Sequence, residues 1–358
     1  MNAAVISLGS VSSQWTISEM KNYFRSVDDI YLHDVEVHFP GKKGLVLVKG
    51  KPIPHYDCIY VKGSFRYSNL LRALSDILEH KCYLPIQPTA FTVVHDKILT
   101  QIALEKHGIP TPKTYLNSTP ESTRKLLETL NYPIMLKFPQ GTQGKGVMFA
   151  ESYAAASSLI DAFSALNQPV ILQEYIETGS EDVRVIVVGE KVVAGMRRKA
   201  SIKEKRANIH VGGEGREYEP TELVKKIALS TARAIGAEIC GVDLLMSSAR
   251  GPLVIEANIS PGLQGITKAT KKNVANMIAK YVHKKAEEYK KNKVSSGAKS
   301  IIAEMNVEKG HAHEIISPLD FRGTRMLLPE VVTKITHFND HDEYIIQITK
   351  DKVLLKKY

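Results

Sequence analysis

The sequence contains little cysteine. Its three cysteines, Cys58, Cys82 and Cys240, are far apart and form no CxxC pair. An odd number of isolated cysteines argues against a disulfide framework, and the missing CxxC spacing argues against a zinc ribbon.

Long apolar runs and a leader-like start are also missing. No apolar run approaches 18 residues, and the first ten residues, MNAAVISLGS, lack a basic segment followed by a long apolar core. These absences argue against a transmembrane helix and a secretory signal, so we expect a cytoplasmic protein. The first 85 residues contain no GxGxxG motif, so the sequence does not support a dinucleotide-binding fold with bound NAD.

Length and charge favour a globular protein that attracts anions. The 358 residues suffice for two to four subdomains, and 43% hydrophobic with 24% charged residues is typical of a folded chain. The formal net charge of +10 implies an anionic partner, such as a nucleotide, an acidic peptide or nucleic acid. Much of this excess lies in residues 268–293, predicted to form an amphipathic helix that either is a solvated face or steers an acidic substrate.

Residues 238–267 predict an acidic hairpin. Two apolar runs flank the turn-forming residues 247–252, and Asp243 and Glu256 are equidistant from the centre of that turn. A symmetric register places them opposite each other, with Asn258 on the same face. Their oxygens suit Mg²⁺ or Mn²⁺ and not zinc. The alternative is that Asp243 caps a strand end and Glu256 forms an ion pair with a basic residue such as Arg250.

A glycine-rich turn follows a strand that ends in Lys137. Residues 141–146, GTQGKG, let backbone amides converge on a phosphate because glycine has no Cβ to block the approach. The turn is not a Walker loop, since a strand follows it and not a helix. It predicts either a flap over a triphosphate or a plain hairpin turn.

The rest of the chain alternates strands and helices. Residues 1–88 predict an open α/β domain, and a helix over Phe91–His107 carries Lys97. Residues 182–199 predict a hairpin from which Arg184, Arg197 and Arg198 emerge, and inward-facing arginines need an anion, such as a substrate carboxylate or phosphate. The basic loop Lys203–Gly213 is either a substrate loop or an exposed connection.

An ordered set of motifs resembles the ATP-grasp superfamily, and most closely its RimK-type amino-acid ligases. In chain order the motifs are Lys97, LKFPQGTQGKGV, QEYI, DVR, RR, RANIHVGG, GVDLL and VIEANISPGLQGI. The resemblance covers roughly residues 85–285. It implies an α/β (α+β) ATP-grasp fold with an N-terminal open α/β domain. Residues 296–358 lie outside the resemblance, and their short strand-like runs predict a small C-terminal β-rich appendage. The domains are then 1–88, the central subdomain 89–172 with its glycine-rich flap, the metal-binding subdomain 173–293, and the β-rich tail 297–358 after a Ser-Ser-Gly linker.

The resemblance also implies a role for each matching residue. Lys97 and Lys137 bind ATP phosphates under the flap of Gly141, Thr142, Gln143, Gly144 and Gly146. Glu174, Tyr175 and Ile176 hold the adenine, and Asp182 lies near the nucleotide sugar. Arg206 and Asn208 match the active-site loop, and Arg184, Arg197 and Arg198 are expected to contact substrate. Two Mg²⁺ or Mn²⁺ ions are bound by Asp243, Glu256 and Asn258.

The function implied is an ATP-dependent carboxylate-amine ligase. It would join glutamate or a related amino acid to an acidic acceptor bearing a carboxylate, without membrane or nucleic-acid partners. A homo-oligomer, either a dimer or a tetramer, is the expected assembly. One alternative is a ligase acting on a coenzyme, a carrier protein or a ribosomal protein tail. Another is an RNA-binding protein with a vestigial nucleotide site, although the lysine-rich stretch has few interleaved aromatic residues for stacking on bases.

Overall fold

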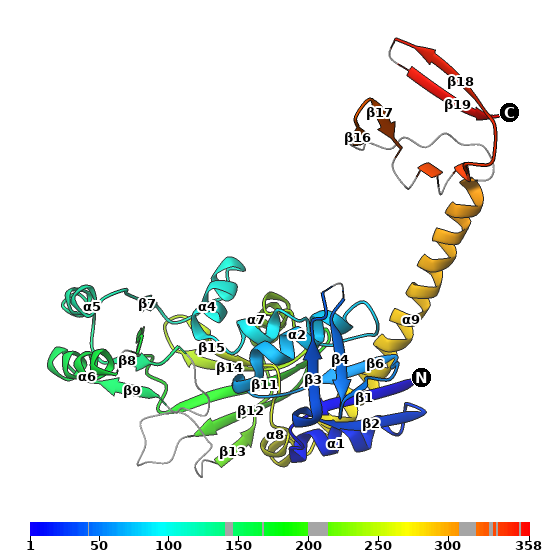
Figure 1. The fold of residues 1–358 in the computed structure, drawn as a ribbon. Helices are drawn as coiled ribbons and strands as arrows, with labels where there is room; N and C mark the ends of the chain where they lie inside the picture. The colour runs from blue at the N-terminus through cyan, green and yellow to red at the C-terminus, as the bar shows by residue number, and fades with distance from the viewer. Residues whose placement is uncertain are drawn as a thin grey trace. The chain divides into compact units, whose positions relative to one another are not determined.

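The fold was obtained as a computed structural model of the whole chain (Figure 1). It describes residues 1–41, 43–139, 146–166, 168–199, 214–307, 320–328, 332–333, 336–350 and 352–358. The chain divides into two compact units, Met1–Lys290 and Lys291–Tyr358. None of the described helices is long and apolar enough to cross a membrane.

The N-terminal domain is built on a parallel sheet. Its central strand β1 (Asn2–Ser7) pairs with β2 (Ser26–Tyr31) on one side and with β6 (Cys58–Val61) on the other. Strands β1 and β6 are buried because they consist almost entirely of apolar residues, as expected for parallel strands, whereas the edge strand β2 is mostly exposed. Its helices are α1 (Val11–Met20) and α2 (Ser68–Leu78), with the short helices η1 (Leu32–Asp34) and η2 (Phe65–Tyr67) in the connections. A separate antiparallel sheet contains β3 (Val35–His38), β4 (Leu45–Val48) and β5 (Lys51–Pro52).

The helix predicted over residues 91–107 is interrupted. The structure has a short α3 (Ala90–Val93) and a separate α4 (Lys97–Lys106). Asp96 is the reason for the break, because its side chain accepts hydrogen bonds from the backbone N–H groups of Ile98 and Leu99 and so begins a new helix. The break makes Lys97 the first residue of α4.

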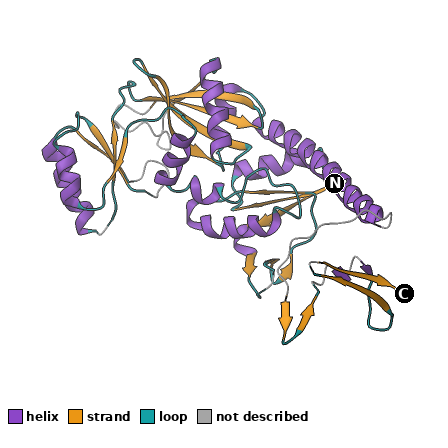
Figure 2. Cartoon of the chain, turned by 90° about the horizontal axis from the view of Figure 1, so that it is seen from above, coloured by secondary structure: helices purple, strands orange, loops and turns teal. Residues whose placement is uncertain are grey.

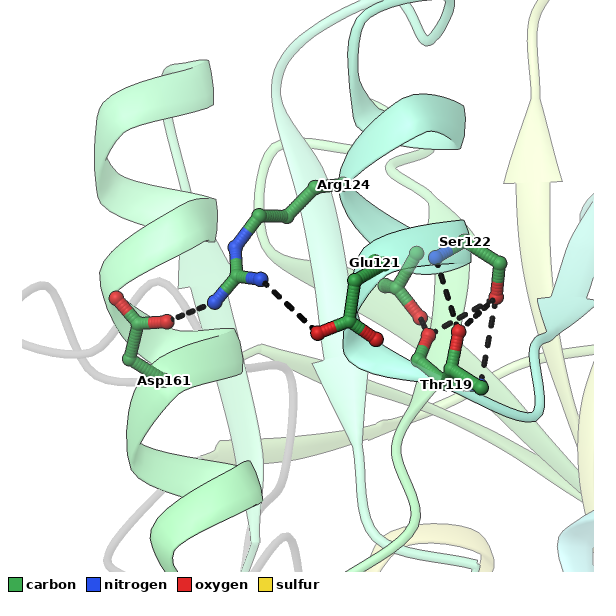
Figure 3. Close-up of polar contacts among 6 residues, drawn as sticks. Thr119, Glu121, Ser122, Arg124 and Asp161 are labelled. Carbon is green, nitrogen blue, oxygen red and sulfur yellow. Dashed lines mark hydrogen bonds and ion pairs between the residues drawn. The ribbon is translucent and has the colours of Figure 1, made fainter.

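The small sheet carries the predicted flap. Its strand order is β7 (Thr114–Leu116), β10 (Ile171–Glu174), β8 (Ile134–Lys137) and β9 (Val147–Ala150), and α5 (Pro120–Leu127) and α6 (Tyr153–Ala165) pack against it around a core of their own (Figure 2). Thr119 and Ser122 form a capping box that begins α5, and Arg124 joins α5 to Asp161 of α6 through an ion pair (Figure 3).

The large sheet is antiparallel and forms the centre of the larger unit. Its order is β13 (Glu214–Glu217), β12 (Lys191–Lys199), β11 (Glu181–Val188), β14 (Ile239–Ser247) and β15 (Gly251–Asn258). Helix α7 (Glu222–Ala234) begins at the N-cap Thr221, and α8 (Gln264–Thr270) follows β15. The predicted hairpin turning at Gly189-Glu190 is confirmed as β11 and β12.

The C-terminal region differs from its prediction in one respect. Helix α9 (Val274–Val307) runs without a break through residues 295–297, where a Ser-Ser-Gly linker was predicted. Beyond it, β16 (Asp320–Arg322) pairs with β17 (Arg325–Leu327), and β18 (Tyr344–Thr349) pairs with β19 (Lys352–Lys357). These strand pairs confirm the β-rich tail, whereas its predicted boundary at residue 297 stays a prediction.

Candidate functional site

The β14–β15 hairpin places the three predicted metal ligands at one end of the large sheet. Asp243 lies directly opposite Glu256, and Asn258 lies opposite Gly241. A β-bulge shifts the register between Asp243 and Leu244, because Leu244 pairs with Val254 and leaves Ile255 without a partner. The predicted pairing of Asp243 with Glu256 is therefore confirmed, but the register is not symmetric.

Asp243 is the centre of a buried ion-pair network. Arg184 on β11 donates to both of its carboxylate oxygens, at 2.7 and 2.6 Å, and Arg198 on β12 lies 2.8 Å away. Arg198 also donates to both oxygens of Asp182, each at 2.6 Å. Although burial alone would raise the pKa of Asp243, Arg184 and Arg198 hold it below its usual range. Asp243 is thus ionised at neutral pH.

This network gives the three predicted arginines partners inside the protein. Arg184, Arg197 and Arg198 were expected to meet substrate anions, and each has a carboxylate of the protein as its partner, so their substrate contacts stay a prediction. The partner of the exposed Arg197 is Glu181, at 3.0 Å. Asp182, expected near the nucleotide sugar, has both oxygens engaged by Arg198. Sequence could not assign Asp243 to Arg184, because it does not show that β11 and β14 are neighbours.

Glu256 differs from Asp243 in having no ion pair or hydrogen bond within the described residues. Its half-buried side chain is desolvated and lies near Asp243, and both effects raise its pKa. Lys97 and Lys137 are close enough to oppose that shift. The alternative pairing of Glu256 with Arg250 is wrong, because Arg250 forms its ion pair with Glu174.

Two lysines face Glu256 from different elements. Lys137 ends β8, and desolvation lowers its pKa to about 8 although Glu256 opposes the shift. Its Nζ donates to Oε1 of Gln173, whose Nε2 donates to Oγ1 of Thr114 at 2.9 Å. The backbone N–H of Lys97 donates to the carbonyl of Pro139 at 3.0 Å, which ties the start of α4 to the chain just after Lys137. Gln173 is a positioning residue that sequence reasoning missed.

These residues surround a cavity of about 280 Å³. Its lining comes from the N-terminal domain, from α4, from the small sheet and from the large sheet, and it includes Lys97, Lys137, Gln173, Arg184, Glu256 and Asn258. A cavity with two lysines, a carboxylate without an ion-pair partner in the described chain and a carboxamide can hold phosphate groups together with a divalent cation.

The oxygens present suit a magnesium ion. A carboxylate offers about four lone-pair positions, and the hydrogen bonds from Arg184 and Arg198 take three of those on Asp243. Glu256 keeps both oxygens, and Oδ1 of Asn258 accepts one hydrogen bond, from the backbone N–H of Ser260 at 2.9 Å. Oxygen donors of this kind match Mg²⁺. Glu256 and Asn258, which line the cavity, would hold the ion, and Asp243 would be the third residue to supply an oxygen ligand.

The strands beside the predicted flap have the expected geometry. Lys137 pairs with Val147 in the antiparallel β8–β9 hairpin, and the N–H of Phe138 donates to the carbonyl of Gly146 at 3.0 Å. Gly146 has φ +75°, and a Cβ there would lie 2.2 Å from the Phe138 ring, so only glycine fits. The remaining flap residues, Gly141, Thr142, Gln143 and Gly144, lie outside the described residues, as do Arg206 and Asn208.

The predicted adenine segment begins at Glu174, the last residue of β10. Glu174 accepts a hydrogen bond from the N–H of Lys113 at 2.6 Å and another from Arg250. The Tyr175 ring packs edge-on against Phe149 at 5.1 Å between centroids, and Ile176 is half-buried. The side chain of Glu174 therefore ties the small sheet to the β14–β15 turn, while nucleotide contacts of residues 174–176 stay a prediction.

Comparison with known proteins decides the family. Residues 94–282 match the family model described as RimK-like ATP-grasp domain. The chain belongs to the RimK-like ATP-grasp family. A Legionella pneumophila protein named "Probable alpha-L-glutamate ligase" is 36% identical over 265 residues, covering 72% of this chain and 83% of that protein. A protein of the same name from Alkalilimnicola ehrlichii is 44% identical over 261 residues, covering 72% and 83%.

Solved structures share the fold of this RimK-like protein. The ATP-grasp ligase PsnB, complexed with minimal precursor, Mg and ADP, superimposes with a TM-score of 0.63 at 17% identity, covering 80% of this chain and 98% of PsnB. A RimK domain ATP-grasp protein from Sphaerobacter thermophilus gives 0.61 at 16% identity, covering 78% and 99%. The predicted fold class is confirmed, and the protein is an ATP-dependent carboxylate-amine ligase that forms amide bonds.

Proposed function

We propose that this RimK-like ligase joins the amine of L-glutamate, or of a related amino acid, to a carboxylate of an acidic acceptor. The observation that carries the proposal is the cavity in which Lys97 and Lys137 face Glu256 and Asn258. The name shared by the curated relatives, alpha-L-glutamate ligase, supports glutamate as the amino acid. The net charge of +10 suits an acidic acceptor.

The reaction has two steps. An oxygen of the acceptor carboxylate attacks the γ-phosphorus of ATP, so that an acylphosphate forms and ADP leaves. The amine then attacks the acyl carbon, the C–N bond forms, inorganic phosphate leaves and the amine loses a proton. Lys97 and Lys137 offset the negative charge of the phosphates in both steps, because they approach from two sides of the cavity.

The proposed metal site is Glu256, Asn258 and Asp243, and Mg²⁺ bound there would neutralise triphosphate charge as a Lewis acid. We propose Mg²⁺ as the natural ion because PsnB, which shares the fold, was solved with Mg and ADP. Mn²⁺ has similar ligand preferences and is the expected substitute. Arg184 and Arg198 would position Asp243 through their hydrogen bonds.

The direct test measures ADP release by the purified protein with ATP, Mg²⁺ and each amino acid in turn, in the presence of a cell extract as the source of acceptors. Mass spectrometry of the extract then identifies the product by the mass of the added residue. We expect ADP release that depends on glutamate and on an acceptor. Retention of RNA in a salt-sensitive manner without ADP release would favour the RNA-binding alternative.

Lys137 offers a second test of this function. Replacing Lys137 with methionine keeps the length of the side chain but removes its charge, so we expect the rate of ADP release to fall about 100-fold or more. The effect should appear in both kcat and the KM for ATP. The control is Lys191→Met, because Lys191 is exposed in the β11–β12 turn region and should have no effect. Unchanged kcat and KM for ATP in Lys137→Met would show that Lys137 does not bind the ATP phosphates.

A further inference from the structure

Three aromatic rings form a row at the carboxyl edge of the N-terminal sheet. Tyr31 is the last residue of β2, and the centroid of its ring lies 4.8 Å from that of His33. The centroid of the His33 ring lies 5.5 Å from that of Tyr67, whose hydroxyl is 2.9 Å from Nε2 of His33. The Tyr31 ring also lies beside Gly9, since a Cβ at Gly9 would be 3.7 Å from it. We refer to Tyr31, His33 and Tyr67 as the aromatic row.

The aromatic row is accessible to a ligand. Tyr31 is 45% exposed, His33 is exposed and Tyr67 is half-buried. Tyrosine is enriched in surfaces that bind other molecules, because its ring offers a large apolar face and its hydroxyl a hydrogen bond. None of these three residues lines the cavity, and the proposed reaction gives them no role. The aromatic row is therefore a candidate for contacts with the part of a substrate that lies outside the cavity.

The aromatic row joins the cavity at Tyr67. The N–H of Tyr67 donates to the carbonyl of Ser64 at 3.0 Å, and Ser64 lines the cavity together with its neighbours Gly63 and Phe65. The N–H of Gly63 donates to Oγ of Ser260 at 3.1 Å, which ties this loop to the chain after β15. Ligands of open α/β sheets bind outside the carboxyl ends of the strands, and this loop follows the carboxyl end of β6. A substrate that extends from the cavity past this loop reaches the aromatic row.

The other end of the row leads back to the cavity through α1. Gly9 connects β1 to that helix and lies beside Tyr31. Oγ of Ser12 in α1 accepts a hydrogen bond from the N–H of Leu263 at 2.8 Å, and the adjacent Gly262 lines the cavity. The carboxyl edge of the N-terminal sheet is therefore held beside the cavity at both ends of the row.

A cation lies at the Tyr67 end of the row. Arg66 stands between Phe65, which lines the cavity, and Tyr67. Its side chain is exposed and has no ion pair or hydrogen bond within the described residues. An arginine of this kind is available to bind a carboxylate in the bidentate geometry that guanidinium favours. A negative charge of a ligand is thus favoured close to the cavity.

The opposite end of the row carries negative charge. Asp29 shares a face of β2 with Tyr31, and Asp34 lies in η1 just after that strand. Lys49 pairs with Asp34 at 3.4 Å, whereas Asp29 has no ion pair in the described chain. A nucleic-acid backbone needs several cations in succession, so this charge distribution disfavours it. A peptide whose acidic residue lies at the Arg66 end suits the charges at both ends.

We propose that the aromatic row and Arg66 dock the acceptor, and that this acceptor is a peptide chain with an acidic side chain next to its reacting carboxylate. The inference rests on the proposed ligase function and narrows its acceptor to a peptide. The cavity of about 280 Å³ has the size of a site for one small ligand, so the acceptor chain beyond its reacting end lies outside it. The rings then pack on peptide planes and apolar side chains, and Arg66 pairs with the acidic side chain.

The first test is a binding measurement with a charge reversal at each edge of the sheet. The probe is a fluorescein-labelled peptide of alternating glutamate and alanine, about ten residues long, whose binding to the full-length protein is followed by fluorescence anisotropy. Arg66→Glu should weaken this binding about tenfold or more. Arg25→Glu is the matched control, because the exposed Arg25 precedes β2 and so lies at the amino edge of the same sheet. It changes the net charge equally and should alter the Kd less than about twofold.

The second test removes a ring. Tyr31→Ala should weaken binding of the same peptide about fivefold, and Tyr31→Phe should keep most of the affinity because the ring face remains. Tyr153→Ala is the matched control, since Tyr153 is 39% exposed in α6 and does not line the cavity. A role of Tyr31 in folding alone predicts a lower melting temperature with unchanged peptide affinity.

Three results would overturn the inference. One is peptide binding that is absent, or equal in the wild type, Arg66→Glu and Tyr31→Ala. Another is equal weakening by Arg25→Glu and Arg66→Glu, which would reduce the effect to overall charge. The third is tighter binding of a uridine oligonucleotide of the same length, weakened by Arg66→Glu and Tyr31→Ala, which would assign the surface to single-stranded nucleic acid.

Turnover measurements separate this inference from the proposed function. Peptide binding needs no ATP, so it is measured whether or not the protein releases ADP. Absence of ADP release by the wild type with cell extract and amino acids would contradict the proposed function. With ADP release established, Arg66→Glu should raise the KM for the acceptor about tenfold and leave the KM for ATP within about twofold. Equal KM values for the acceptor in Arg66→Glu and the wild type would contradict the docking surface alone.

Discussion

Replacing Glu256 with glutamine should lower the rate of ADP release about 1000-fold, which corresponds to about 4 kcal/mol of transition-state stabilisation. The substitution keeps the shape of the side chain but removes the charge that would neutralise a bound cation. Glu256 has no ion pair within the described chain, and its burial beside Asp243 raises its pKa, so its neutral replacement should not destabilise the fold. The measurement is steady-state ADP release over a range of Mg²⁺ concentrations.

The matched control is Glu190→Gln. Glu190 is an exposed glutamate in the turn between β11 and β12, and its replacement should leave ADP release unchanged. A melting temperature for Glu256→Gln equal to or above that of the wild type would show that the lost activity does not come from unfolding. If Glu256→Gln kept more than about a tenth of the activity at saturating Mg²⁺, the metal assignment would be refuted.

Arg198 and Arg197 are neighbours on β12 with very different expected effects on stability. Replacing the buried Arg198 with alanine leaves Asp182 without its partner and Asp243 with Arg184 alone, at an expected cost of about 3–5 kcal/mol in the free energy of unfolding. Replacing Arg197 removes an exposed ion pair with Glu181 and a contact with the Tyr218 ring, at an expected cost of about 1 kcal/mol. Urea denaturation of the two variants measures the difference.

This comparison also separates stability from chemistry. Because Arg198 positions Asp243, the Arg198→Ala variant should lose ADP release at temperatures where it is still folded, whereas Arg197→Ala should keep it. Equal denaturation midpoints for the two variants would contradict the buried network. Full activity of a folded Arg198→Ala variant would contradict the positioning role.

The sequence predicted those parts of the site that depend on local pattern. Asp243 and Glu256 belong to one hairpin, and Lys137 and Gly146 belong to another, so short-range periodicity was enough to place each pair. Arg184 and Asp243 are 59 residues apart, and only the pairing of β11 with β14 brings them together.

Two local predictions failed for identifiable reasons. A continuous helix was predicted over residues 91–107, although aspartate before a helical run, here Asp96, is a recognised N-cap. The linker at residues 295–297 was inferred from Ser-Ser-Gly composition, but a single glycine costs a helix only about 1 kcal/mol relative to alanine. The helix formers on either side outweigh that cost, and α9 continues.

The pairing of Asp243 with Glu256 determines where the length of this protein can vary. The turn Ser248–Arg250 lies beyond the last strand pair, so an insertion there lengthens a loop and leaves the facing of Asp243 and Glu256 intact. A one-residue insertion between Glu256 and Asn258 would instead turn one of these two side chains to the opposite side of the sheet. Insertions and deletions in related chains should therefore accumulate at the turn and be absent between Glu256 and Asn258.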